Sequence, residues 1–163
     1  MNRMVRALAL AAPLVLGLAP PLPAALQLST DRRSVFFGIM NLGEEKTLAN
    51  SGTYHNEVTV SSDDGRLWYL KVSLIQPLSS GDSTIPLDAF AWQVTSTSGS
   101  GTLGQGNDPR AFQLTPDLVY ISGPNESGGV PVQLQFRYQL HVPDAQASGV
   151  YQSAIRFTLS EVL

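Results

Sequence analysis

The stretch from Val132 to Val142 reads Val-Gln-Leu-Gln-Phe-Arg-Tyr-Gln-Leu-His-Val, and it decides the fold. Apolar and polar side chains alternate along it without interruption, so Phe136 and Tyr138 fall on one face and Arg137 on the other. A period of two does not suit a helix and is what a half-buried β-strand needs. Because an apolar sheet face must be covered by another apolar face, the sequence predicts a second sheet packed against this strand.

Working outward from this stretch, the same alternation returns in several segments that are separated by glycine and proline. We expect strands at 26–29, 34–40, 54–61, 66–74, 90–95, 132–142 and 151–160, and one or two short strands within 112–122 around Pro116. Segment 34–40 is apolar nearly throughout, which favours a buried strand with Gly38 as a bulge. Asp64-Gly65 predicts a hairpin turn between the strands on either side of it. The Gly- and Ser-rich stretch 96–107 is expected to be a mobile loop.

These features together predict an all-β protein, an antiparallel immunoglobulin-like β-sandwich with no amphipathic helix. Residues 26–163 are expected to form one domain. Residues 1–25 have the order of a signal peptide: Arg3 and Arg6, then an apolar run, then prolines and Ala24-Ala25. The alternative, a transmembrane anchor, is disfavoured because the apolar run is short and rich in proline. We therefore expect an exported protein.

Charge and cysteine content exclude several classes of function. The 163 residues carry a formal net charge of −3. Removal of residues 1–25 takes away two arginines and no acid, which leaves −5. Such a chain lacks the basic patches that nucleic acids or anionic membranes require. With no Cys, an exported domain must rely on its core rather than on disulfides.

Two further segments carry a recognisable pattern. The first runs from Gly65 to Val72 and contains Trp-x-Leu at Trp68 after a turn glycine, and the second, 147–159, contains Gly-x-Tyr before a closing strand. In these segments the chain resembles the WxL domains of bacterial surface proteins, with Phe157 where the family has a second tryptophan. The resemblance implies a secreted β-sandwich module that attaches non-covalently to the cell wall, and hence a protein that is secreted, periplasmic or at the surface of a bacterial cell.

The residue types that carry catalysis are sparse. The two histidines, His55 and His141, are expected at the surface, and neither lies beside a Gly-framed serine or in a zinc-ligand spacing. Loop carboxylates at 63, 64, 82 and 88 could bind calcium, but Asp-Gly also serves a β-turn on conformational grounds alone. Glu57 is the one acid clearly within a strand, whereas glycoside hydrolysis needs two. We predict no enzyme, no catalytic residues, no cofactor and no metal.

Aromatic side chains offer the remaining candidate site. If Trp68, Tyr69, Phe90 and Trp92 were exposed on a sheet face, they could form a ligand or partner surface on which a sugar ring stacks. The alternative is that each belongs to the core. Whether these rings are exposed or buried distinguishes a ligand surface from a core.

Three functions remain open. The first is a non-catalytic structural or interaction module whose partner is a component of the cell envelope or another β-sandwich subunit. The second is a pilus-like fibre subunit that donates the alternating segment 26–29 to a neighbour by β-strand addition. The third is a carbohydrate-binding module.

Overall fold

The computed structural model of the chain describes residues 26–49, 54–104 and 106–163. Within them the regular structure is antiparallel β-sheet, with one short 3-10 helix, η1 (Leu87–Ala89). This confirms the predicted all-β fold and its β-sandwich character. The predicted signal peptide lies outside the described residues. The strands are β1 (Gln27–Thr30), β2 (Glu45–Leu48), β3 (Asn56–Ser61), β4 (Tyr69–Leu74), β5 (Leu78–Ser80), β6 (Ser83–Ile85), β7 (Phe90–Thr97), β8 (Thr102–Leu103), β9 (Arg110–Ala111), β10 (Asp117–Ile121), β11 (Val132–His141) and β12 (Ile155–Ser160).

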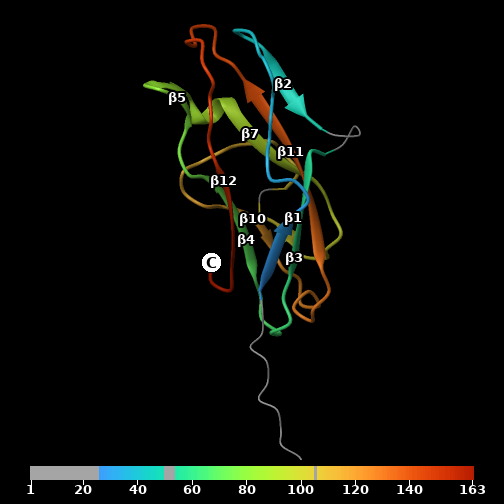
Figure 1. Ribbon diagram of the computed structural model, residues 1–163. Coiled ribbons are helices and arrows are strands. Elements are labelled where there is room, and N and C mark those ends of the chain that lie inside the picture. Colours follow the sequence, from blue (N-terminus) through green and yellow to red (C-terminus); the bar gives the residue numbers. More distant parts are fainter. Residues whose placement is uncertain (1–25, 50–53, 105) are drawn as a thin grey trace, which may run out of the picture.

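The predicted central strand is β11, which lies in the middle of the larger sheet. The strand order there is β1-β3-β11-β7-β9. On one side β11 pairs with β7 along most of its length. On the other side it pairs with β3 as far as Phe136 and with β2 from Tyr138 onward. Figure 1 shows β11, in orange, running through the molecule with β7 and β3 beside it.

The smaller sheet has the order β12-β4-β10-β8, and β5 and β6 form a separate hairpin. The predicted inward faces are correct: Phe136 and Tyr138 of β11 are at most 1% exposed, and Val72 of β4 is equally buried. The two sheets meet across one core, whose fully buried side chains include Val58, Val60, Trp68, Leu70, Val72, Leu74, Val94, Phe112, Tyr120, Leu134, Phe136 and Tyr138.

The prediction of a buried strand at 34–40 is wrong. These residues form no strand, and Phe36 and Ile39 are 80% and 96% exposed. The segment is apolar at nearly every position, so its sequence does not alternate and does not show which side chains face the core. Gly38 has a φ of +77° in irregular chain and is therefore not a bulge in a strand.

The prediction of a hairpin at Asp64-Gly65 is also wrong, although the turn itself is present. Gly65 has the positive φ (+76°) that such a turn requires. Asp64 Oδ1 accepts hydrogen bonds from the Ser62 hydroxyl (2.8 Å) and the Arg66 amide (2.9 Å), which lower the pKa of this carboxyl. However, β3 and β4 lie in different sheets. The turn joins the two layers because its local chemistry does not choose which strands pair.

Truncation of the central aromatic tests the proposed core. We expect Phe136→Ala to lower the free energy of unfolding by about 3–5 kcal/mol, because the ring is fully buried and its removal leaves a cavity. Urea unfolding followed by tryptophan fluorescence measures this. Gln133→Ala, at an exposed position of the same strand, should change stability by less than about 0.5 kcal/mol. Equal effects of the two substitutions would contradict the assignment of faces.

Candidate interaction surfaces

The four aromatic residues proposed as a ligand surface do not form one. Trp68, Phe90 and Trp92 are 0%, 4% and 4% exposed, and only Tyr69 is half-buried on the outer face of β4. Trp92 and Phe90 pair with residues of β11 whose side chains point into the core. For these three the core alternative is therefore correct, and no row of aromatic rings is available for a sugar to stack on.

Trp68 is fixed in place by polar contacts as well as by packing. Its backbone amide donates to Ser122 Oγ (2.9 Å), and its indole Nε1–H donates to the backbone carbonyl of Glu126 (3.2 Å). The ring packs against Tyr120 with a centroid separation of 5.5 Å. A buried indole whose N–H has a partner is a structural element rather than a ligand platform.

A buried carboxylate, that of Glu126, organises this end of the sandwich. The residue is 5% exposed, yet its carboxylate accepts hydrogen bonds from the Gly123 amide (2.6 Å) and the Tyr120 hydroxyl (2.8 Å). The amides of Ser100 and Gly101 also donate to it. We call these five residues the Glu126 network. It ties the turn before β11 to the segment between β7 and β8.

The pKa values in the network follow from this geometry. Burial alone would raise the pKa of Glu126, but the hydrogen bonds from Gly123, Tyr120 and the two further amides outweigh it, and the pKa lies below its ordinary value. Burial and the adjacent carboxylate raise the pKa of Tyr120 to about 12. The pair is therefore an ionised carboxylate with a neutral phenol at neutral pH, and all the carboxylate's contacts stabilise the charged form.

The Gly- and Ser-rich stretch predicted to be a loop instead contains the end of β7 and all of β8. Gly99, Gly101 and Gly104 have the G-x-G-x-x-G spacing found in phosphate-binding loops. Here that spacing serves close packing. A Cβ on Gly99 would meet the Tyr120 hydroxyl at 2.1 Å, and one on Gly101 would meet the Ile121 carbonyl at 2.2 Å. In the described residues β9 and β10 come next, and not the helix whose N-terminus binds the phosphate in such loops.

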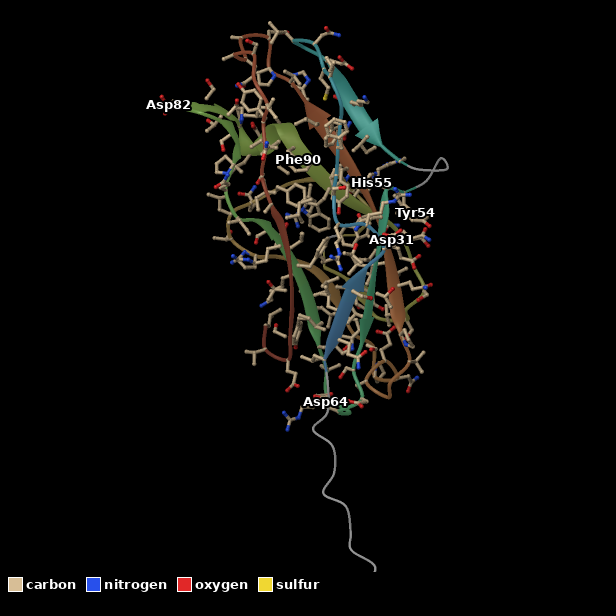
Figure 2. The ribbon with its side chains drawn as sticks, in the orientation of Figure 1. Asp31, Tyr54, His55, Asp64, Asp82 and Phe90 are labelled. Carbon is tan, nitrogen blue, oxygen red and sulfur yellow. The ribbon has the colours of Figure 1, made fainter. Side chains whose placement is uncertain are left out.

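His55 is not at the surface, contrary to expectation, whereas His141 is exposed as predicted. The His55 ring lies edge-on to Tyr138, and its Nε2 is 3.2 Å from the carbonyl oxygen of Ser34. In Figure 2, Asp64 and Asp82 lie toward opposite ends of the molecule and so cannot share a calcium ion. No group of His, Asp and Glu among the described residues is arranged to hold a metal.

Among the described residues, segment 34–42, which we call the strap, exposes three large apolar side chains. Its side chains point in two directions. Val35, Phe37 and Met40 pack against the core, with Phe37 edge-on to Phe90 at a centroid distance of 5.8 Å. The opposite side chains face solvent: Phe36, Ile39 and Leu42 are 80%, 96% and 57% exposed.

The strap is held by side chains rather than by a backbone ladder. Lys46 Nζ donates to the Phe37 carbonyl (2.6 Å), and His55 contacts the Ser34 carbonyl. Backbone pairing resumes only at Gly43, whose amide donates to the Val142 carbonyl (2.8 Å). The exposed apolar side chains are thus presented from irregular chain, and exposed apolar side chains gathered on one segment are typical of an interaction site.

Comparison with known proteins assigns no family. No protein-family model matches the chain, and no curated protein is similar to it in sequence. No helix in the described part of the chain is long and apolar enough to span a membrane. Any function must therefore be argued from the surfaces themselves.

The Glu126 network predicts a pH-dependent contribution to stability. We expect Glu126→Gln to lower the free energy of unfolding by about 1–3 kcal/mol at pH 7, because a charge-assisted acceptor of several buried donors is lost. Since the folded pKa lies below the unfolded one, the wild-type advantage exists above the ordinary carboxyl range and disappears as pH falls through the folded pKa. Urea titrations across acidic pH measure this difference.

The matched control is Glu161→Gln, which removes a carboxylate paired with Arg66 at the surface (2.9 Å). Exposed ion pairs contribute little, so this variant should stay within about 1 kcal/mol of wild type. If the difference in free energy of unfolding between wild type and Glu126→Gln grew as the pH was lowered, the lowered pKa of Glu126 would be contradicted.

Proposed function

We propose that this chain is an exported, non-catalytic interaction module that docks on a component of the bacterial cell envelope through the strap. The observation that carries the proposal is the strong exposure of Phe36 and Ile39 on a segment whose other side chains anchor it to the core. Exposed apolar side chains gathered on one segment are typical of a protein–protein contact. The signal-peptide pattern of residues 1–25 supports a place outside the cytoplasm.

The resemblance to WxL domains supports the same class of function but not the same contact residues. Trp68 is wholly buried, and Phe157 replaces the second tryptophan. Attachment to an envelope would therefore use the strap rather than tryptophan side chains. The other two functions have less support, because β1 pairs with β3 in its own sheet and the aromatic candidates for sugar stacking are mostly buried.

Cell fractionation tests the proposal. We expect the wild-type chain in the envelope fraction of the producing cells, and we expect Phe36→Ser with Ile39→Ser to shift most of it to the soluble exported fraction. Because both side chains already face solvent, the free energy of unfolding should change by less than about 0.5 kcal/mol. Val150→Ser, at another exposed apolar position, is the control and should leave the distribution unchanged. An envelope-bound double variant, or a wild-type chain found in the cytoplasm, would refute the proposal.

A further inference from the structure

The strand β12 has an unpaired edge. It pairs with β4 from Ile155 to Ser160, and no other strand pairs with it in the described residues. At six residues it is longer than the other strands that end a sheet, since β1 has four residues and β8 and β9 have two each. Figure 1 shows β12, in red, as the last strand before the C-terminus. A long open edge is a template for another strand.

The pairing pattern identifies which backbone groups are open. The Ile75 amide donates to the Ala154 carbonyl (2.9 Å), so Ala154 points toward β4. In an antiparallel ladder, successive residues bond to opposite sides. The N–H and C=O groups of Ile155, Phe157 and Leu159 therefore point away from β4. In agreement, Leu74, the partner of Ile155, donates its amide to Gln113 on the other side of β4 (2.8 Å).

The same three residues have incompletely covered side chains. Their partners in β4, which are Leu74, Val72 and Leu70, are at most 2% exposed. Ile155, Phe157 and Leu159 face the core as well, but each remains half-buried. Phe157 packs edge-on against Phe136 of the larger sheet at 5.1 Å and still keeps part of its ring accessible. The edge therefore combines open hydrogen-bonding groups with apolar surface.

Nothing in β12 blocks the approach of another strand. Its sequence, Ile-Arg-Phe-Thr-Leu-Ser, contains no proline and no lysine. Its one charged residue, Arg156, is exposed and alternates with the core-facing residues Ile155 and Phe157. Protected edges usually carry such residues or are very short, as β8 and β9 are here.

We propose that β12 pairs antiparallel with β12 of a second copy of this chain, about a two-fold axis that passes beside Phe157. In this register Phe157 faces its own counterpart and Ile155 faces Leu159 of the second copy. Each of the three residues with open backbone groups then meets another such residue, so every open donor finds an acceptor. The contact goes beyond the proposed docking function, since it uses a different surface and needs no envelope component.

The sequence of β12 favours a second copy as the occupant because the strand is complementary to itself. In the proposed register the apolar side chains meet one another across the edge. Arg156 lies opposite Thr158 of the second copy, whereas sliding the strands by two residues would place Arg156 opposite its own counterpart. The contact uses the same surface on both copies, so it closes at a dimer and does not propagate into a fibre.

Sedimentation velocity of the purified full chain over a concentration series tests the proposal. We expect a monomer–dimer equilibrium, and we expect Thr158→Arg to raise the dimer dissociation constant about tenfold or more, because it sets two pairs of like charges opposite each other. Thr102→Arg introduces the same charge at the exposed opposite edge of the sheet and should leave the equilibrium unchanged. Adding Arg156→Glu to Thr158→Arg should restore the dimer, which a loss of stability alone would not allow.

Cysteine cross-linking checks the register independently, because the chain has no Cys of its own. Arg156 and Thr158 of the second copy form a pair that is not hydrogen-bonded, with Cα atoms about 4.5 Å apart, within reach of a disulfide. A mixture of Arg156→Cys and Thr158→Cys chains should therefore form covalent heterodimers faster than either variant alone.

Two results would overturn the proposal. One is a chain that stays monomeric at its highest soluble concentration. The other is a dimer that responds equally to Thr102→Arg and Thr158→Arg. Neither result depends on the strap, so a Phe36→Ser with Ile39→Ser variant that stays bound to the envelope and still dimerises would refute only the docking function.

Discussion

The structure depends on the need to bury the inner face of β11. Phe136 packs against Trp92 and Tyr138 within the larger sheet and against Phe157 of the smaller sheet. One side chain thus contacts both layers, and the strand that carries it pairs with β3, β7 and β2. Because neighbouring strands must keep their own apolar faces on the same side, the register of β11 sets which residues of three other strands enter the core. A sandwich without cysteine has no covalent link to replace this contact.

Strands in which apolar and polar residues alternate could be predicted from the sequence. The prediction of a strand at 34–40 failed because it rested on apolar composition and not on alternation. Phe136 and Tyr138 occupy the face that alternation assigned to them, because in a half-buried strand every second residue is apolar. The strap carries no such pattern, because Phe36 and Phe37 are both apolar although the first faces solvent and the second packs against the core. Turn chemistry was informative only locally. Gly65 supplies the conformation that the turn needs, but whether β3 and β4 pair depends on partners that lie far away in the sequence.

The candidate surfaces were less predictable than the fold, since they depend on which groups are left over after the core forms. Trp68 and Trp92 have the residue type of a ligand platform, and only their burial shows that they are not one. Nothing in the sequence singles out Glu126, yet the amides of Ser100, Gly101 and Gly123 and the Tyr120 hydroxyl donate to its carboxylate. The contacts with Ser100 and Gly101 join residues about 25 positions apart and leave no periodic signal. Gly99 and Gly101 lie only two positions apart in the sequence. Glycines so close together were the signal in the sequence that another chain segment approaches the backbone there.

The two proposed surfaces differ in what they offer a partner, and that difference suggests how they would work together. The strap presents side chains such as Phe36 and Ile39, which can discriminate between partners by shape. The edge of β12 presents backbone groups, which recognise any extended strand and gain selectivity only through register. A dimer closed through β12 would carry two straps on one particle. Docking of the first strap would then raise the effective concentration of the second near the envelope, so a weak contact at each strap could give firm attachment without further contact area. This coupling holds only if both straps reach the same surface, a geometric condition that the two-fold axis beside Phe157 determines.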